Sequence, residues 1–493
     1  MAAATNHCPL LRLFLFILLF TTTTTTTPLV SSNAIFSLKY RYEGTNRSLN
    51  SLRAHDTNRL RMFSDVDLPL GGSGTPDSSG LYYARIGIGT PSKSYYMQVD
   101  TGADVTWVNC IQCTDCPQRG YHGIELTLYD PKDSLTSRTV SCGEKFCMEV
   151  SGGLLTGCAA DSNLSCNYAE LYGDGGSSTG YFVNDIIQYG QISGDLQTTA
   201  SNGSVSFGCS AGEFLDQASS DYALDGLLGF GKSNWSTISQ LALSGRVSKM
   251  FAHCLDGENG GGIFAIGQIV KPKVNTTNLI PSQPHYNVNL TAVKVGDDYL
   301  SLPSNIFEAG GRKGAIIDCG TTLAYLPAFI YEPLVSQILA QQPSLDLRTV
   351  QDLYSCFQFS ESLDDGFPNV TFYFQNSLQL EVLPHEYLFP VDNLWCIGWQ
   401  NSGNQSRDKM NLTLFGDLVL LNKLVLYDLE NQTIGWTPYN CSSSIEVKDE
   451  QSGTVHLVGA QDLPTSASSG TVVPIVTGFL LVLLGCCFWS PNR

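Results

Sequence analysis

Two Asp-x-Gly turns, one in each half of the chain, constrain the fold more than any other feature. The first, Asp100–Gly102, follows the apolar run 95–99, and the second, Asp318–Gly320, follows the run 314–317. Glycine accepts the backbone conformation that such a tight turn requires. An aspartate turn behind an apolar strand in both halves predicts two similar lobes that bring Asp100 and Asp318 together.

A pair of close carboxylates suits the activation of water. Two carboxylates a few ångströms apart do not both ionise, so one keeps a proton. The charged group can take a proton from water while the neutral group donates a hydrogen bond to a substrate carbonyl. This chemistry needs neither a metal nor a covalent intermediate. A single Asp-x-Gly is more often a surface turn, so the prediction depends on the repeat.

The repeat extends beyond the turns. Leu224–Phe230 and Leu414–Leu420 each place an apolar-apolar-Gly strand about a hundred residues after an aspartate turn, where the strand can support the turn from behind. Alternating apolar runs predict strands at 82–89, 168–172, 180–190, 203–208, 262–267, 286–295, 370–374, 411–415 and 424–428. Helices are expected only at 236–244 and 328–340. The fold class is therefore all-β with minor helices, in two lobes around a cleft.

The composition excludes several function classes. With 27 basic and 45 acidic residues, the formal net charge is −18, which argues against nucleic-acid binding. We expect no cofactor and no metal. Cys110, Cys113 and Cys116 have zinc-like spacing, but no further ligand pair completes a site. The histidines form no ligand cluster in the sequence: His7, His55, His122, His253, His285, His385 and His456.

The cysteines indicate an oxidising compartment. Of the 16 cysteines, Cys8 lies near the N-terminus and Cys486 and Cys487 near the C-terminus, which leaves 13. Cys319, inside the second turn, is the expected odd cysteine, and the other twelve can form six disulfides.

The chain divides into six expected segments. They are a signal peptide (1–32), a prosegment (33–76), an N-terminal lobe (77–283) with a cysteine-rich disulfide-held loop region (110–166), a C-terminal lobe (284–445), a linker or anchor-attachment region (446–470) and a hydrophobic signal (471–493). Five arginines make the prosegment basic, although a plain polar linker fits equally well. The last segment ends close to the C-terminus, which favours a glycosylphosphatidylinositol (GPI) signal over a single membrane span. Candidate attachment sites are Ser466, Ala467, Ser468 and Ser469.

Sequons for N-glycosylation are numerous, as on a secreted glycoprotein. They are Asn46, Asn163, Asn202, Asn234, Asn275, Asn289, Asn369, Asn404, Asn411, Asn431 and Asn440.

From residue 80 to residue 441 these motifs, in this order, resemble the pepsin-like aspartic peptidases, and the cysteine-rich insertion is similar to the plant nepenthesin/nucellin-like branch. The resemblance implies that Asp100 and Asp318 are catalytic. It also implies that Tyr172 and Gly173 belong to a flap that closes over substrate, and that Trp107 packs beneath it. By the same resemblance, Cys356 and Cys396 form the disulfide of the C-terminal lobe.

The active loops depart from the family pattern at two positions. Thr101, Gly102, Gly320 and Thr321 fit the expected support of the aspartates, but Cys319 stands where the family has a hydroxyl that grips the opposite loop. A thiol is a weak donor and acceptor, so we expect a looser grip. Ala103 likewise replaces a serine, which suggests an activity optimum less acidic than is usual for the family.

The expected protein is a monomeric aspartic endopeptidase made as a zymogen, secreted and glycosylated, and either anchored to the outer face of the plasma membrane or released to the apoplast. Its partners are a peptide or protein substrate and, through a lipid anchor, the membrane. The alternative is a catalytically impaired binding or inhibitor protein on the same scaffold.

Overall fold

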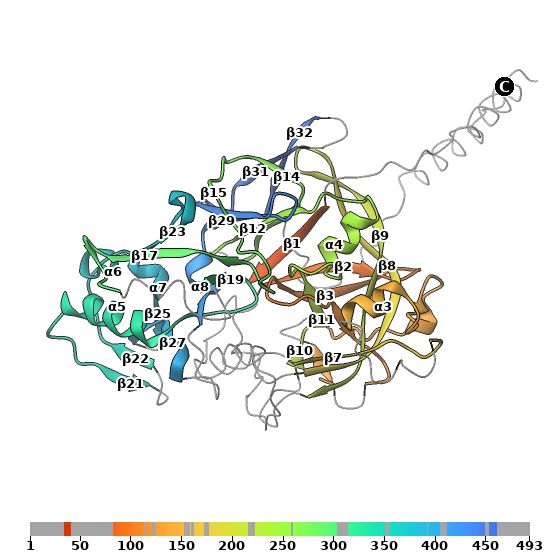
Figure 1. Cartoon of the computed structure of the whole chain (residues 1–493), viewed down its shortest axis with the longest axis horizontal. Coiled ribbons are helices and arrows are strands. Elements are labelled where there is room, and N and C mark those ends of the chain that lie inside the picture. Colours follow the sequence, from red (N-terminus) through yellow and green to blue (C-terminus); the bar gives the residue numbers. More distant parts are fainter. Residues whose placement is uncertain are drawn as a thin grey trace, which may run out of the picture.

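The structure is a computed structural model, and the whole chain is drawn in Figure 1. The residues that the structure describes are 34–40, 82–113, 116–120, 125–151, 158, 162–171, 177–214, 222–257, 260–302, 314–350, 354–391, 393–404, 412–448 and 453–460. The segment expected as signal peptide and most of the segment expected as prosegment lie outside them. So do the expected flap residues Tyr172 and Gly173, the sequons Asn46 and Asn411, and the candidate attachment sites 466–469.

The N-terminal half is built from strands with one long hairpin. The strands are β1 (Ala34–Tyr40), β2 (Tyr82–Ile88), β3 (Lys93–Asp100), β4 (Trp107–Asn109), β5 (Arg119–Gly120), β6 (Arg138–Thr139), β7 (Asn167–Leu171), β8 (Ser177–Gly194), β9 (Gln197–Phe214), β10 (Tyr222–Ala223), β11 (Gly226–Gly229), β12 (Met250–Leu255), β13 (Gly262–Ile266), β14 (Gln268–Lys271) and β15 (Thr276–Asn278).

The C-terminal half uses shorter strands. They are β16 (Asn287–Val288), β17 (Leu290–Val295), β18 (Asp298–Tyr299), β19 (Ala315–Ile317), β20 (Ala324–Leu326), β21 (Arg348–Val350), β22 (Tyr354–Phe357), β23 (Val370–Phe374), β24 (Gln379–Val382), β25 (Leu388–Val391), β26 (Leu394–Ile397), β27 (Trp399–Asn401), β28 (Thr413–Phe415), β29 (Lys423–Asp428), β30 (Thr433–Pro438), β31 (Ser444–Lys448) and β32 (Val455–Gly459).

Helices are few, as expected. They are α3 (Lys145–Val150), α4 (Thr237–Leu243), α5 (Ala328–Ala340), α6 (Leu363–Gly366), α7 (Pro384–Tyr387) and α8 (Asp417–Leu420), with the 3-10 turns η2 (Pro131–Asp133), η3 (Gln375–Ser377) and η4 (Ser402–Asn404). The two helices predicted from sequence, at 236–244 and 328–340, correspond to α4 and α5. The all-β prediction is thus confirmed.

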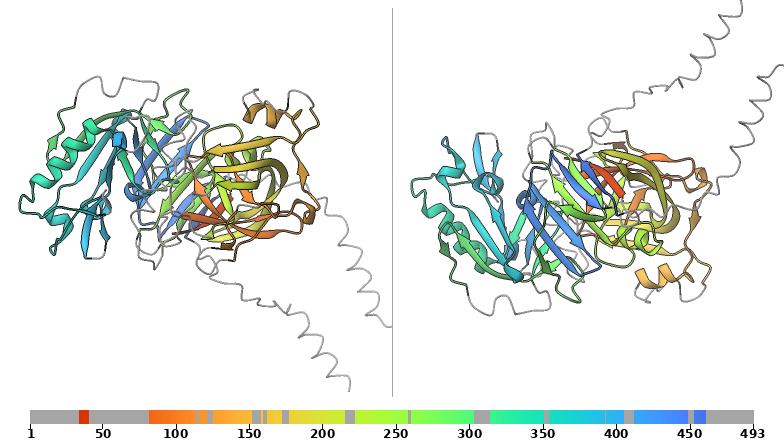
Figure 2. Two further views of the ribbon diagram at one scale, coloured as in Figure 1. Left: turned by 90° about the horizontal axis from the view of Figure 1, so that it is seen from below. Right: turned by 90° about the horizontal axis from the view of Figure 1, so that it is seen from above.

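A central layer joins the two lobes. One large sheet runs in the order β15-β30-β29-β12-β13-β1-β2-β3-β11-β4-β9-β8-β6, so strands from near the end of the chain pair directly with strands from its middle. At the junction β12 pairs antiparallel with β29, with Phe251 opposite Tyr427. Figure 2 shows these central strands between the C-terminal half, in teal, and the N-terminal half, in orange and yellow.

Packing on one face of the central layer makes a continuous core across the lobes, and a separate cluster covers the other face. Phe251 stacks on Tyr427 with ring centroids 4.5 Å apart, and Tyr286 meets Tyr427 edge-on at 4.6 Å. Burial of such aromatic side chains is the main stabilising contribution, because each removes a large apolar area from water. The two aspartate turns therefore sit on a rigid support.

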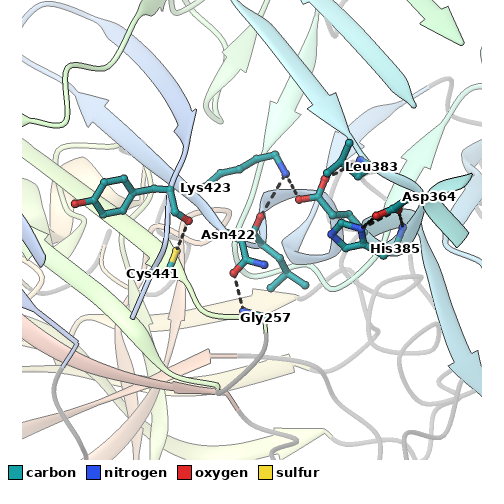
Figure 3. A network of polar contacts seen from close by, with 10 residues as sticks. Gly257, Asp364, Leu383, His385, Asn422, Lys423 and Cys441 are labelled. Atoms are coloured by element: carbon teal, nitrogen blue, oxygen red, sulfur yellow. Dashed lines mark hydrogen bonds and ion pairs between the residues drawn. The ribbon is translucent and has the colours of Figure 1, made fainter. Parts of the chain in front are cut away.

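A buried ion pair fastens the C-terminal lobe to the central layer (Figure 3). Lys423, the first residue of β29, donates to Glu386 of α7 at 2.6 Å, and both side chains are more than nine-tenths buried. Glu386 also accepts the Leu383 N–H at 2.8 Å. Next to Lys423, the side-chain oxygen of Asn422 accepts the Gly257 N–H at 3.2 Å.

Six disulfides link the twelve cysteines as expected, and Cys319 is the free, buried one among the residues that the structure describes. The pairs are Cys110–Cys209, Cys113–Cys116, Cys142–Cys158, Cys147–Cys166, Cys254–Cys441 and Cys356–Cys396. Four of them involve the insertion 110–166, where the structure also has helix α3 and two short strands in the segment expected to be loop. The pairing Cys356–Cys396, implied by the family resemblance, is confirmed.

Strands also occur at both margins of the two lobes. β1, within the segment expected as prosegment, pairs with β13, with Ala34 opposite Ile266. β31 and β32, which overlap the segment expected as linker, form a three-stranded sheet with β14. Ile445, Val447 and Val458 of these strands are buried against the central layer, so apolar burial holds this hairpin in place. In the part of the chain that the structure describes, no helix is both long and apolar enough to cross a membrane.

Candidate active site

The first aspartate turn is held by the strand that the sequence predicted to brace it. β3 ends at Asp100, and β11 runs parallel beside it with Gly229 opposite Asp100. The Phe230 N–H donates to the Asp100 carbonyl at 2.8 Å. The buried side chain of Asp100 accepts through Oδ1 from the N–H of Gly102 at 2.8 Å and of Ala103 at 3.0 Å.

The second turn repeats this arrangement in the C-terminal lobe. β28 runs parallel to β19, and the Asp318 N–H donates to the Phe415 carbonyl at 3.0 Å. Oδ1 of Asp318 accepts the Gly320 N–H at 2.9 Å, and Oδ2 accepts the hydroxyl of Thr321 at 2.7 Å. Thr321 thus supplies a side-chain donor that Ala103, at the matching place in the first turn, does not have.

Glycine is required where the strand that supports each aspartate turn passes closest to that turn, at Gly229 in β11 and at Gly416 directly after β28. A Cβ atom on Gly416 would lie 2.4 Å from the carbonyl oxygens of both Thr321 and Leu323. A Cβ atom on Gly229 would lie 2.8 Å from the carbonyl oxygen of Asp104. Only a residue without a side chain lets the brace and the turn pack this closely.

The two turns are in contact through Thr101. Its Oγ1 accepts the Cys319 N–H at 3.0 Å and donates to Oδ1 of Asp318 at 3.4 Å. Because Thr101 directly follows Asp100, folding brings the two aspartate turns together, as the repeat predicted. Cys319 contributes only its backbone to this pair of bonds.

The thiol of Cys319 is not a nucleophile in this setting. Its side chain is buried, and burial raises the pKa of the thiol well above its ordinary value, helped by the nearby carboxylates of Asp417 and Asp318. The thiolate is the reactive form of cysteine, so the neutral thiol is inert.

The expected flap is the hairpin of β7 and β8, in which Leu171 pairs with Ser177. Its tip, with Tyr172 and Gly173, lies outside the described residues. Trp107, half-buried on β4, packs against the cluster that contains Tyr168 of β7. Trp107 also packs against Ala103 of the first turn, so it lies between the base of the hairpin and the active loop.

Two further acids near the turns were not identified from the sequence. Asp104 accepts the Ser233 N–H at 3.0 Å, and burial raises the pKa of its carboxyl. Burial raises the pKa of Glu170 on β7 to about 7, with a further contribution from the charge of Asp104. Their proximity depends on how β7 packs over the first turn, and no local sequence pattern marks it.

The central sheet brings His253 and Tyr427 beneath the turns, and sequence reasoning missed both. Each side chain is fully buried, and Nε2 of His253 lies 3.1 Å from Oη of Tyr427. Burial raises the pKa of the Tyr427 hydroxyl well above its ordinary value, with a further contribution from the nearby Cys319 and a smaller one from Asp318. The only hint in the sequence is a histidine within an otherwise apolar strand, which also fits a simple core position.

Potential metal ligands cluster once among the residues that the structure describes, at Cys142, Cys147 and Cys158. All three sulfurs are in disulfides, so they are not available as thiolate ligands.

The sequons differ in exposure. Asn163, Asn202, Asn234, Asn275, Asn431 and Asn440 are exposed, whereas Asn289 and Asn369 are half-buried; Asn404 also lies within the described chain. Asn369 donates its amide to Glu381 at 3.1 Å.

Comparison with known proteins agrees with this geometry. Family models described as xylanase inhibitor N-terminal and xylanase inhibitor C-terminal match residues 82–268 and 285–438. Aspartic proteinase 36 of Arabidopsis thaliana is 44% identical over 462 residues, which cover 93% of this chain and 94% of that protein. Aspartic proteinase nepenthesin-2 of Nepenthes gracilis is 27% identical over 419 residues, which cover 82% of this chain and 85% of that protein.

Solved structures share the fold. Basic 7S globulin from soybean superposes with a TM-score of 0.58 at 16% identity. The match covers 83% of this chain and 97% of the globulin chain. Conglutin gamma from lupine seeds gives a TM-score of 0.60 at 17% identity. The match covers 83% of this chain and 95% of the conglutin chain. Together with a relative that is 44% identical over almost the whole length and the two matching family models, the paired aspartate turns show that the chain belongs to the family of pepsin-like aspartic proteinases, which are aspartic-type endopeptidases.

Proposed function

We propose that this protein hydrolyses peptide bonds with a water molecule activated between Asp100 and Asp318. The observation that carries the proposal is the contact between the two turns: Thr101, adjacent to Asp100, bonds both Asp318 and the Cys319 N–H. Both aspartate side chains are also buried. In such a site electrostatic interactions with a substrate are stronger than in bulk water.

The reaction follows from the two protonation states of the pair. The ionised carboxylate takes a proton from water as the water oxygen bonds to the scissile carbonyl carbon. The neutral carboxyl donates a hydrogen bond to the carbonyl oxygen and stabilises the tetrahedral intermediate. A proton then passes to the amide nitrogen, the C–N bond breaks, and a carboxylic acid and an amine leave.

The substrate would be an extended peptide. The hairpin of β7 and β8 is the expected flap, and its strands can pair with a peptide in β fashion. Tyr172 at its tip would close over the bound peptide and exclude water. An apolar P1 residue is expected from family resemblance.

The setting we propose is extracellular. Six disulfides and six exposed sequons support a secreted, glycosylated protein. The small-residue and apolar segments at the C-terminus support a GPI anchor at the cell surface. The basic segment before residue 76 supports synthesis as a zymogen.

A binding or inhibitor protein on the same scaffold is the alternative, and the family models carry the name of xylanase inhibitors. The presence of both Asp100 and Asp318, each in a braced turn, argues against it.

Cleavage of a peptide library with and without pepstatin tests the proposal. Asp100→Asn and Asp318→Asn should each lower kcat/KM by at least about a thousandfold, because each removes one carboxylate of the pair. Glu149→Gln, at an exposed position of α3, is a control that should cleave like the wild type. Unchanged cleavage by either aspartate variant would contradict the two-aspartate mechanism, and an inert wild type that still binds peptides would favour the alternative.

A further inference from the structure

The strand that ends in Asp100 carries a polar side chain, Gln98, on the same face as the aspartate. Along β3, Met97 and Val99 are fully buried in the main core, whereas Gln98 between them is only half-buried. Side chains alternate across a strand, so Gln98 points away from that core. Gln98 and Asp100 therefore share a face of the sheet, about 7 Å apart along the strand.

Apolar side chains flank Gln98 on this face. Its partners in the sheet are Tyr83 of β2 and Leu227 of β11. Residues directly opposite each other in a sheet share a face. Tyr83 packs in a small cluster with Leu224, and Leu227 packs with Ala103. Because Ala103 belongs to the first aspartate turn, that turn contacts the face that carries Gln98.

The base of the expected flap lies beside the same face. Trp107 of β4 is paired with Leu227 in the sheet and packs against it. Trp107 also packs against the cluster that contains Tyr168 of β7, the first strand of the flap hairpin. A peptide held between this hairpin and Asp100 would therefore pass across the face that carries Gln98.

Gln98 also has a buried donor without a partner. Its Nε2 is buried and makes no hydrogen bond within the part of the chain that the structure describes. Such a donor costs free energy in the folded protein, because water no longer solvates it. An apolar residue of similar length, such as methionine, would fill the position without this cost. An unpartnered amide next to Asp100 indicates that its partner comes from the substrate.

We propose that Gln98 is a specificity-determining residue that selects substrates with a hydrogen-bond acceptor in a side chain next to the scissile bond. This inference rests on the proposed function above. An extended peptide advances about 3.3 Å per residue, so a group about 7 Å from Asp100 is within reach of the residues that flank the scissile bond. The family resemblance alone favours an apolar residue at P1, and Gln98 changes this expectation for one flanking position.

Glutamine is the substrate residue that fits this face best. Its aliphatic stem would lie against Tyr83 and Leu227, and its side-chain oxygen would accept from Nε2 of Gln98. Glutamate also has an acceptor, but its charge is unfavourable beside the ionised carboxylate of the catalytic pair. A methionine side chain of the same length leaves Nε2 without a partner.

Peptides that differ at a single flanking position test the proposal. That position holds glutamine, methionine sulfoxide or methionine, and each of the two flanking positions is varied in turn. At one of them, the wild type should cleave the glutamine and sulfoxide peptides with kcat/KM about tenfold above that of the methionine peptide, the effect of one hydrogen bond. The sulfoxide has an acceptor oxygen but no N–H, so its preference identifies Gln98 as the donor.

Gln98→Met removes the donor and keeps the length of the side chain. It should lower the ratio of kcat/KM for the glutamine peptide to that for the methionine peptide to about one or below. The matched control is Gln379→Met, at an exposed position of β24 in the C-terminal lobe, which should keep the wild-type ratio. An unchanged ratio in Gln98→Met would overturn the proposal, as would a wild type that favours methionine over both acceptors at both positions.

The melting temperature separates this role from a structural one. Gln98→Met removes a buried donor that has no partner in the free protein, so the variant should melt at the wild-type temperature or above it. A glutamine that stabilised the fold would show the opposite change. A clearly lower melting temperature for Gln98→Met would therefore overturn the proposal.

The proposed function and this inference fail in different ways. If the wild type shows no pepstatin-sensitive cleavage, the proposed function fails. Fluorescence anisotropy with the same peptides, labelled, then tests Gln98: the glutamine peptide should bind about tenfold more tightly than the methionine peptide, and Gln98→Met should remove the difference. Equal affinities in the wild type would overturn the inference. Pepstatin-sensitive cleavage without any preference for an acceptor would overturn the inference and leave the proposed function in place.

Discussion

At the scale of single residues, the two halves of the active site are not equivalent. The Asp318 carboxylate accepts hydrogen bonds from the hydroxyls of Thr321 and Thr101. In the first turn the residue that matches Thr321 is Ala103, which has no hydroxyl to donate. Conversely, Thr101 provides a hydroxyl in the first turn where the second has Cys319. Each turn therefore lacks one side-chain donor, at different positions. The pseudo-symmetry of the repeat is kept by the backbone and broken by the side chains.

Cys319→Ser should strengthen the contact between the turns. The serine hydroxyl is a stronger donor and acceptor than the thiol, so we expect a gain of about 0.5–1.5 kcal/mol in stability or a rise in turnover. Melting temperature and kcat of the purified protein measure this. Cys319→Ala is the control, since it removes the thiol without adding a hydroxyl. Equal melting temperature and equal activity in the Ser variant and wild type would rule the effect out.

At the scale of elements, strand β29 connects the lobes because each of its ends has a different partner. It starts at Lys423, which is paired with Glu386 of the C-terminal lobe, and it carries Tyr427 beneath the active loops. Burial lowers the pKa of Lys423, and the charge of Glu386 partly restores it. A buried ion pair stabilises little relative to apolar residues, but breaking it leaves an unpaired charge.

Lys423→Met should therefore destabilise the protein by about 3–5 kcal/mol, because Glu386 would remain charged and buried without its partner. The double variant Lys423→Met/Glu386→Gln should recover a large part of this loss, since glutamine is neutral and keeps an oxygen for the Leu383 N–H. Urea unfolding of the wild type and of both variants provides the measurement. A double variant no more stable than Lys423→Met would show that the pair is not the cause.

At the scale of the whole molecule, the acidic residues around the turns make stability depend on pH. Burial raises the pKa of Glu170 from an ordinary 4.5 to about 7 in the folded protein. Between these values the folded state binds more protons than the unfolded state, so stability decreases as pH rises. Protonation of this acid in the flap strand thus favours the folded state under acidic conditions.

Glu170→Gln should flatten this dependence. Because the side chain is partly exposed, we expect the wild type to lose only about 1–2 kcal/mol through Glu170 between pH 4.5 and pH 7.5. Glu170→Gln should not show this decrease in the free energy of unfolding, because glutamine does not titrate. Urea midpoints at the two pH values test it, with Glu149→Gln on the surface of α3 as control. An unchanged difference between the two midpoints would mean that Glu170 does not titrate in this range.

The sequence by itself determined the repeated aspartate turns, their glycine-containing braces, the β class and the free cysteine, because each is encoded in a short contiguous pattern. Only the tertiary structure decided which side chains support the turns from below and which acids lie near them. His253 and Tyr427 are 174 residues apart, and their contact depends on β12 pairing with β29 across the two lobes. Such a pairing is set by the packing of the whole core, and local sequence patterns do not encode it.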